Sequence, residues 1–194
     1  MVAVGRDLCS TASLGGTAAP AVGHCFTCYP ANVTNSSLQS PQGGAQVRFP
    51  PPLVFLGSLL VGAFLHSAVL PLPFPLSRSI TLAAGGVLVV AAIALFAASL
   101  RLFRATGQHP RPWLPTPSLI VEGPYRFSRN PLYVALTLAQ IGLGLLLDDA
   151  WIVALSAVSL GVVHFIAVQP EEAYLLERFG EPYRRYLGSV RRYL

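Results

Sequence analysis

The chain of 194 residues is 53% hydrophobic and only 11% charged, whereas soluble domains average about 45–50% apolar and about 25% charged residues. Its mean hydropathy is +0.58, and a soluble fold of this size cannot bury so much apolar surface. The composition therefore excludes a charged disordered chain and predicts an integral membrane protein. All 13 basic residues are arginine and the net charge is +5. The arginines flank apolar stretches, as in cytoplasmic loops of membrane proteins, so we expect no nucleic-acid partner.

Residues 1–46 are rich in Gly, Ala, Ser, Thr and Pro and have no apolar periodicity. This composition predicts a flexible or disordered tail before a membrane domain over residues 47–194. The tail contains Cys9, Cys25 and Cys28, with His24 beside the last two. Four such residues suffice in number for zinc, but their spacing fits no standard zinc finger. A lone C-x-x-C is a weak signal, so we interpret the cysteines as incidental and assign no metal.

Four apolar segments follow, near residues 53–70, 80–100, 132–147 and 150–168. Each approaches or reaches the length of about 20 residues that crosses a bilayer as a helix. Prolines at 71, 73 and 75 separate the first two segments, and Asp148-Asp149 predicts a tight turn between the last two. The predicted fold class is an all-α, polytopic helical membrane protein with about four transmembrane helices.

The C-terminal residues 170–194 predict amphipathic helices that lie along the membrane interface. Apolar side chains recur there every three or four residues, from Leu176 and Phe179 onward, which places them on one helix face. Gly180 and Pro182 favour the end of one helix and the start of another, so we expect two short helices.

The distribution of arginine predicts the orientation of the chain in the membrane. With four spans, the residues before the first span, the loop 101–131 and the C-terminal segment share one side and hold 12 arginines, against Arg78 alone on the other. The positive-inside rule makes the arginine-rich side cytoplasmic. The two polar segments on that side are therefore the expected location of any chemistry.

Two motifs occur in these polar segments, and each has a purely structural interpretation on its own. The first runs from Gly123 to Tyr133 as Gly-Pro-Tyr-Arg-Phe-Ser-Arg-Asn-Pro-Leu-Tyr, and its Asn-Pro step is typical of a helix start. The second is the acidic pair Glu171-Glu172, which complements the positive end of a helix dipole.

Together, the two motifs resemble the isoprenylcysteine carboxyl methyltransferase and phospholipid methyltransferase family. The shared pattern is Gly-x-Tyr-Arg-x-x-Arg-(His/Asn)-Pro-x-Tyr, a membrane hairpin, a Glu-Glu pair and Phe-Gly-x-x-Tyr. Here it comprises Gly123, Tyr125, Arg126, Arg129, Asn130, Pro131, Tyr133, Glu171, Glu172, Phe179, Gly180 and Tyr183. The resemblance implies an integral membrane enzyme that transfers the methyl group of S-adenosylmethionine and holds this cofactor between the loop 101–131 and the C-terminal helices.

The resemblance also implies which residues bind the cofactor. Carried over position by position, they are Ser118, Leu119, Ile120, Tyr125, Asn130, Pro131, Leu132, Tyr133 and Glu171. Aromatic faces and a carboxylate suit the sulfonium and ammonium groups of the cofactor, and arginine suits its carboxylate. Arg129 and Glu172 are candidates for orienting the substrate. We nominate no catalytic acid or base, because methyl transfer to a nucleophilic acceptor depends mainly on positioning.

Three departures from the isoprenylcysteine enzymes leave the acceptor open. Pro117 and Asn130 each stand where those enzymes carry histidine, and Ala167 stands where they carry a substrate-side arginine. The predicted acceptor is a lipophilic or small membrane-permeant molecule or a membrane lipid, methylated at a carboxylate, a phospholipid amine or a small thiol. A membrane scaffold that kept the fold is the alternative outside enzymes. No obligate protein partner is indicated.

Two histidines, His66 and His164, lie within the predicted spans. Ionisable groups inside a membrane are functional candidates by default. We nevertheless interpret both as side chains hydrogen-bonded within the helical bundle.

Overall fold

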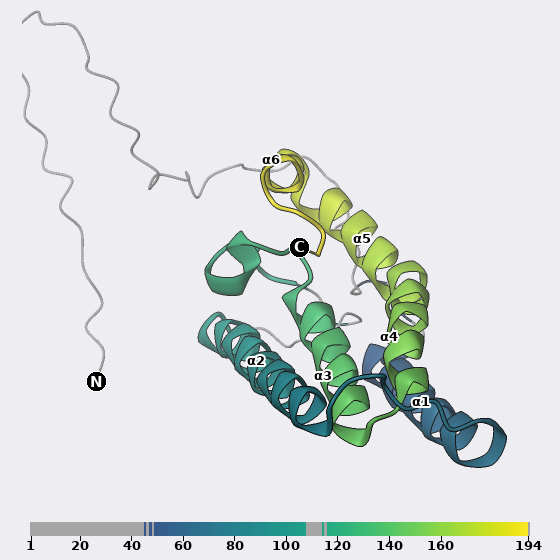
Figure 1. Ribbon diagram of the computed structural model, residues 1–194. Coiled ribbons are helices and arrows are strands. Elements are labelled where there is room, and N and C mark those ends of the chain that lie inside the picture. The colour runs from purple at the N-terminus through teal and green to yellow at the C-terminus, as the bar shows by residue number, and fades with distance from the viewer. Residues whose placement is uncertain (1–44, 46, 48, 108–113, 115, 194) are drawn as a thin grey trace, which may run out of the picture. The chain divides into compact units, whose positions relative to one another are not determined.

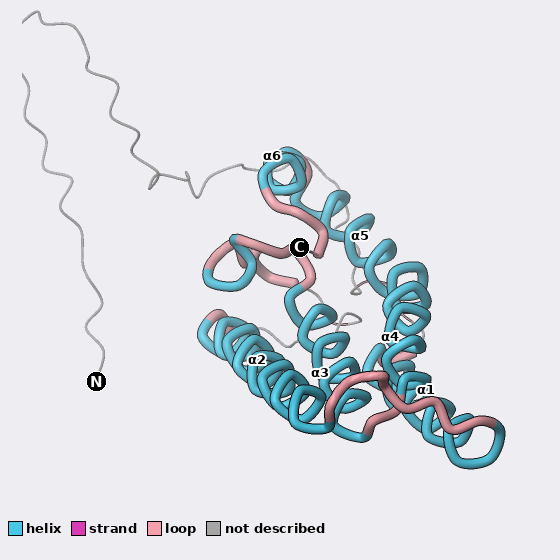
Figure 2. The backbone as a smooth tube through the Cα atoms, in the orientation of Figure 1, coloured by secondary structure: helices cyan, strands magenta, loops and turns pink. Residues whose placement is uncertain are grey.

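The computed structural model describes residues 45, 47, 49–107, 114 and 116–193. The chain divides into two units, residues 1–38 and 39–194, and every described residue belongs to the second. This part of the chain is helical and contains no named strand (Figures 1 and 2). The predicted all-α fold is confirmed. His24 and the three cysteines lie outside the described residues.

The helices cover the four predicted spans. They are α1 (Pro51–Phe64), α2 (Arg78–Ala105), α3 (Pro131–Leu147), α4 (Ala150–Val163), α5 (Gln169–Phe179) and α6 (Glu181–Ser189). The helical segments 51–69, 78–105 and 150–179 are long and apolar enough to cross a membrane, whereas α3, with 17 residues, is shorter. As expected, the C-terminal residues form two helices, which meet at Gly180.

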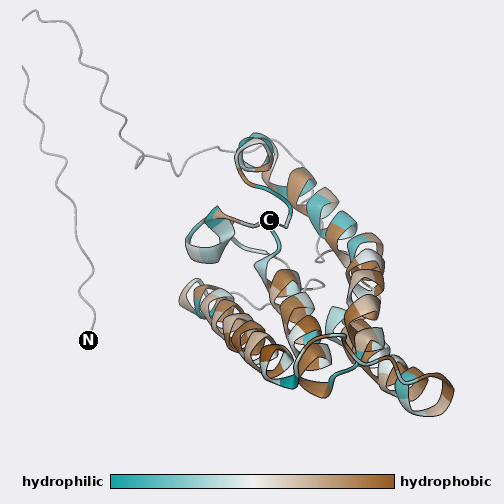
Figure 3. Cartoon of the chain, in the orientation of Figure 1, coloured by the Kyte–Doolittle hydropathy of each residue, from teal (hydrophilic) through white to brown (hydrophobic). Residues whose placement is uncertain are grey.

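The four apolar helices pack in the order α2, α3, α4, α1 (Figure 1). In the view of Figure 3, hydrophobic residues predominate along these four helices, while hydrophilic residues are more frequent towards α5, α6 and the loops. In the most apolar 18-residue stretch of the helical segment 51–69, only 11% of the residues are buried. In the corresponding stretch of segment 78–105, the buried share is 17%. The remaining apolar surface faces outward, and the lipid bilayer is the environment that makes this favourable.

Glycines allow close approach of neighbouring helices. A Cβ atom built on Gly85 of α2 would lie 2.8 Å from the carbonyl oxygen of Gly142 of α3, and one on Gly142 would lie 2.9 Å from the carbonyl oxygen of Gly85. On the other side of the bundle, a Cβ on Gly62 of α1 would lie 3.0 Å from the backbone of Ile152 in α4. Small residues at helix contacts are typical of membrane proteins, where van der Waals packing drives helix association.

A short polar network joins α1, α3 and α4 inside the bundle. The hydroxyl of Ser159 donates to that of Ser58 at 2.6 Å, and Ser58 contacts Oε1 of Gln140 at 3.3 Å. The amide nitrogen of Gln140 donates to the carbonyl of Ile152 at 3.1 Å. These bonds satisfy buried polar groups that would otherwise be costly in an apolar environment.

The predicted tight turn between α3 and α4 is present. Asp148 adopts a left-handed conformation with φ 57°, and the Asp149 carboxylate accepts hydrogen bonds from the amides of Trp151 and Ile152 in the first turn of α4, at 2.9 and 3.3 Å. The expectation for His66 is wrong, because its Nδ1 is buried without a hydrogen-bond partner and lies 3.5 Å from Oδ1 of Asp149.

The helix of the fourth span does not break at Pro170, where the sequence predicts the start of a separate segment. A π-helical turn, His164–Val168, joins α4 directly to α5. Proline lacks an amide hydrogen and its ring clashes with the carbonyl four residues earlier in a regular helix. The wider π-helical turn just before Pro170 relieves this conflict. The helix therefore continues without interruption from α4 into α5, which carries Glu171.

Candidate functional site

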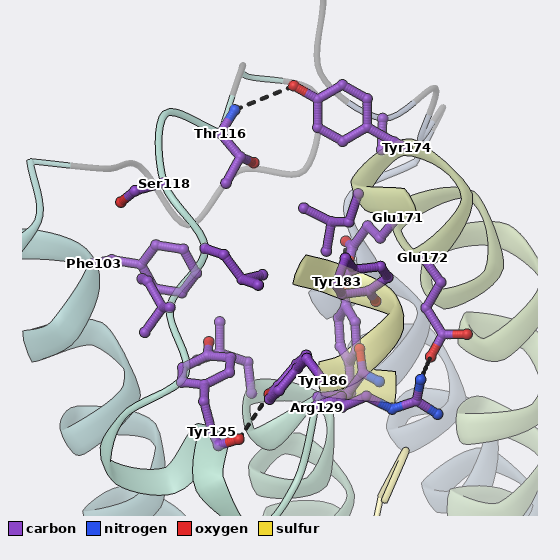
Figure 4. A pocket seen from close by; sticks show the side chains of 17 residues that line it. Phe103, Thr116, Ser118, Tyr125, Arg129, Glu171, Glu172, Tyr174, Tyr183 and Tyr186 are labelled. Carbon is purple, nitrogen blue, oxygen red and sulfur yellow. Dashed lines mark hydrogen bonds and ion pairs between the residues drawn. The ribbon is translucent and has the colours of Figure 1, made fainter. Parts of the chain in front are cut away.

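A pocket lies where the end of α2, the loop before α3, the first turn of α3, α5 and α6 meet (Figure 4). Its lining contains every nominated cofactor residue except Pro131: Ser118, Leu119, Ile120, Tyr125, Asn130, Leu132, Tyr133 and Glu171. Arg129 and Glu172 also line it. Pro131 is instead a buried residue of the first turn of α3, where its fixed φ suits a helix start.

A tyrosine and a carboxylate form a hydrogen bond in the pocket wall. The hydroxyl of Tyr133, on the first turn of α3, donates to Oε1 of Glu171 at 2.5 Å. Tyr133 is 8% exposed. Because the hydrogen bond joins α3 to α5, it fixes the position of the Glu171 carboxylate within the pocket.

Aromatic rings form the opposite wall. The ring of Tyr125, in the 3₁₀ turn Gly123–Arg126, contacts Phe103 edge to face, with ring centres 6.0 Å apart. The hydroxyl of Tyr186, on α6, donates to the carbonyl of Tyr125 at 2.7 Å (Figure 4). These contacts bring α2, the loop and α6 to one surface.

The tyrosines of this wall remain protonated at neutral pH. Burial raises the pKa of the Tyr125 phenol far above its ordinary value, and the carboxylate of Glu171 raises this pKa further. Burial raises the pKa of Tyr186 to about 12, against the opposing effect of the Arg129 charge. Both phenols are therefore neutral groups that offer a hydroxyl and an aromatic face to a ligand.

Two arginines surround the second carboxylate of the pocket. Nε and Nη2 of Arg192 donate to the two carboxylate oxygens of Glu172 at 3.0 and 2.8 Å. Nη1 of Arg129 lies 3.4 Å from Oε1 of the same carboxylate. The two acidic residues thus have different environments, since Glu171 pairs with a neutral phenol and Glu172 with two cations.

The C-terminal residues 191–193 hold the motif of the loop in place. The amide of Arg129 donates to the carbonyl of Arg191 at 2.9 Å, and the side-chain amide of Asn130 donates to the carbonyl of Arg192 at 3.1 Å. The position of Asn130 before Pro131 suggests that its side chain caps α3. The structure shows no such cap, because this side chain bonds to the C-terminal residues instead. His164 is hydrogen-bonded as expected, because its Nδ1 lies 2.9 Å from the hydroxyl of Tyr193.

Several residues of the pocket are absent from the sequence-based nomination: Ala45, Phe103, Thr116, Tyr174, Leu175, Tyr183 and Tyr186. Helical spacing could have identified Tyr174 and Leu175, which follow Glu171 by three and four residues and so share its face. The sequence predicts a loop from residue 101 onward, whereas α2 continues to Ala105 and therefore carries Phe103 into the pocket. Ala45, assigned to the tail, lies in the core and is 3% exposed.

The chain was compared with known proteins. Residues 80–182, just over half of the chain, match the family model described as phospholipid methyltransferase. The matched region includes all but the first two residues of α2, together with the loop motif, α3, α4 and α5. No individual curated protein matched the chain.

Proposed function

Because the chain belongs to the phospholipid methyltransferase family, and is thus a membrane methyltransferase, we propose that it takes its methyl group from S-adenosylmethionine bound in this pocket. The acceptor is a lipophilic or small membrane-permeant molecule, methylated at a carboxylate, an amine or a thiol. The single observation that carries the proposal is the convergence of Tyr125, Tyr133, Glu171 and Arg129 on one pocket from separate elements.

The chemistry of the pocket fits the charges of this cofactor. S-adenosylmethionine carries a cationic sulfonium, an ammonium and a carboxylate. The Glu171 carboxylate suits the ammonium, and the tyrosine faces suit cationic groups through cation–π attraction. The buried Nε of Arg129 has no hydrogen-bond partner, so a cationic donor is present for the carboxylate.

Positioning is the main contribution of the protein to the reaction. When bound, S-adenosylmethionine would supply a methyl group on a positively charged sulfur. An acceptor nucleophile placed opposite that sulfur forms a bond to the methyl carbon as the carbon–sulfur bond breaks, and the neutral thioether S-adenosylhomocysteine leaves. The pocket residues hold the donor, and the surrounding membrane helices concentrate an apolar acceptor beside it. Fixing two reactants in this way replaces a bimolecular encounter with an oriented one and lowers the barrier by several kcal/mol.

We place this site at the cytoplasmic face of the membrane. The pocket lies on the side of the bundle that carries the loop and the C-terminal helices, where the arginines gather. The positive-inside rule favours retention of this side in the cytoplasm.

Calorimetry on the full-length protein in detergent tests the cofactor assignment. We expect saturable binding of S-adenosylmethionine, weakened about tenfold or more by Glu171→Ala, because an ammonium–carboxylate interaction contributes about 1.5–3 kcal/mol. Glu177→Ala changes an exposed carboxylate of the same helix that lies outside the pocket, and should bind like the unchanged protein. Absence of binding in a folded sample would contradict the proposal.

Product analysis then identifies the acceptor. Protein loaded with S-adenosylmethionine that carries an isotopically labelled methyl group is incubated with a prenylcysteine, an aminophospholipid and a small thiol in parallel. We expect label transfer to one of these classes, abolished or strongly reduced by Glu171→Ala. Binding of the cofactor without transfer to any lipophilic acceptor would contradict the proposed acceptor class.

A further inference from the structure

A groove of about 500 Å³ lies between α2 and α3. Among the described residues, it shares no lining residue with the pocket described above. Its volume falls within the range of about 300–1,000 Å³ that is typical of ligand sites. Eight of its ten lining residues are apolar, and the other two are arginines. Four of the apolar residues are alanines, whose small side chains leave this space between the two helices: Ala92, Ala97, Ala135 and Ala139.

The length of the groove matches one leaflet of a bilayer. The two helices approach each other closely at Gly85 and Gly142. The groove begins beyond that contact, at Ala92 of α2, and reaches Arg104. At a rise of 1.5 Å per residue, this part of α2 is about 18 Å long, compared with about 15 Å for half of the hydrocarbon core. An acyl chain that lies in one leaflet has the same extent.

The groove opens towards the bilayer. Ile93 and Phe96, which line it, are 63% and 36% exposed. Ala92 and Ala135, by contrast, are 2% and 1% exposed and lie at its base. An occupant therefore contacts protein on one side and lipid on the other, an environment that suits an apolar chain and not a water-soluble ligand.

Two arginines stand where the groove reaches the C-terminal end of α2. Arg101 and Arg104 are three residues apart, so their side chains share one helix face. Neither side chain forms a hydrogen bond or an ion pair within the described part of the chain. No acidic residue occurs between Arg78 and Val121. Cations at the end of a helix are favourable on their own, but this effect does not account for an apolar groove that ends at them.

We propose that this groove binds an anionic phospholipid of the same leaflet, with one acyl chain along the alanines and the phosphate at Arg101 and Arg104. Basic sites between membrane helices suit acidic lipid headgroups, and guanidinium groups match the geometry of phosphate. The inference goes beyond the proposed function, because this lipid is a ligand of α2 and α3 and not the acceptor of the methyl group. It binds at the end of α2 that carries Phe103 into the pocket.

The test compares two phospholipids with the same acyl chains. Phosphatidylglycerol has a net negative charge, whereas phosphatidylcholine is zwitterionic. Each is titrated into the full-length protein in detergent, and native mass spectrometry measures the fraction of protein that retains one lipid. Phosphatidylglycerol has no amine, thiol or carboxylate, so its binding is independent of the proposed methyl transfer.

We expect the unchanged protein to bind phosphatidylglycerol at least about tenfold more tightly than phosphatidylcholine. The double variant Arg101→Gln/Arg104→Gln should weaken binding of phosphatidylglycerol roughly 30-fold, because each basic residue near an anionic lipid contributes about a factor of five. The matched control is Arg184→Gln/Arg185→Gln, which removes two exposed arginines of α6 outside the groove. This control should bind the lipid as the unchanged protein does.

A second pair of variants tests whether the acyl chain lies in the groove. Ala97→Leu adds apolar volume to the groove and keeps both arginines. It should weaken binding of phosphatidylglycerol about tenfold, because the chain loses the space for two or more methylene groups. Ala94→Leu adds the same volume at an exposed position of α2 outside the groove, and should leave binding unchanged.

Three results would overturn the inference. The first is equal affinity of the unchanged protein for the two lipids, a result that needs no variant to fold. The second is equal weakening by the arginine pairs of α2 and α6, which indicates a general effect of charge. The third is unaltered binding to Ala97→Leu, which would place the acyl chain elsewhere. Since no step of this test involves S-adenosylmethionine, its outcome does not depend on whether the proposed function holds.

Discussion

At the residue scale, the hydrogen bond between Tyr133 and Glu171 connects the stability of the fold to the site. It joins the first turn of α3 to α5 across the pocket. Without the phenol, the carboxylate would keep its place only through the helix that carries it. The same contact therefore serves two purposes, since it shapes the pocket and it partners a carboxylate in partly apolar surroundings.

Tyr133→Phe should destabilise the protein by about 1–3 kcal/mol, because it removes the donor and leaves the carboxylate oxygen of Glu171 without this partner. For a chain of this size, each kcal/mol lowers the melting temperature by about 2–4 °C. Thermal unfolding in detergent measures the change. Tyr183→Phe is the control, since Tyr183 is 1% exposed and its hydroxyl forms no hydrogen bond among the described residues. Equal melting temperatures of the two variants would contradict this role of the hydrogen bond.

The sequence motifs predicted most of the side chains that line the pocket. They did not predict which groups these side chains contact. The resemblance selected Asn130, but its side chain donates to the carbonyl of Arg192, 62 residues further along the chain. No local pattern signals this contact, because it depends on how the C-terminal residues return across the loop. Arg192 was absent from the nomination for the same reason, although both its backbone and its side chain position site residues.

At the scale of elements, the packing of α2 against α3 depends on two glycines that face each other. Gly85 and Gly142 each leave room for the backbone of the other helix. Gly86, the next residue, has open space where its Cβ would lie. The two adjacent glycines of α2 thus separate the effect of helix propensity from the effect of close packing.

Gly85→Ala should lower the melting temperature in detergent, whereas Gly86→Ala should leave it unchanged or raise it. The added methyl group at Gly85 would lie 2.8 Å from a carbonyl oxygen of α3, and overpacking of this kind costs about 1–3 kcal/mol. At Gly86, alanine gains up to about 1 kcal/mol in helix propensity without a clash. Similar effects of both substitutions would show that α2 and α3 do not approach so closely.

The sequence predicted the number and order of the helices because apolar segments and their breaks are local features. Pro71, Pro73, Pro75 and the Asp148-Asp149 turn separate the helices where expected. Two boundaries differed for physical reasons. Charged Arg101 and Arg104 suggested a loop, yet cations are favourable in the last turn of a helix. The sequence predicts that the fourth span ends near residue 168 and that separate helices begin at 170, yet a π-helical turn joins α4 directly to α5.

At the scale of the whole molecule, the arrangement of the helices separates two polar ends across an apolar middle. One end holds the pocket with its loop, α5 and α6. The other holds the turn between α3 and α4, where Asp148 accepts a hydrogen bond from the amide of Phe74 at 3.0 Å. At this end Arg78 donates to the carbonyl of Leu146 at 2.7 Å. The composition alone predicts that the chain spans a membrane. That the pocket residues lie close together could be seen only in the folded structure.

The orientation of these two ends can be tested with single cysteines. In a variant whose natural cysteines are replaced by serine, Ser77→Cys reports the end that carries Arg78, and Arg185→Cys reports α6. The excess of arginine at the pocket end favours its retention in the cytoplasm. A membrane-impermeant maleimide should therefore label Ser77→Cys in intact cells and Arg185→Cys only after lysis. Both positions are exposed, so the side of the membrane decides the labelling. The reverse pattern would place the pocket outside the cytoplasm, where S-adenosylmethionine from cytoplasmic metabolism would not reach it.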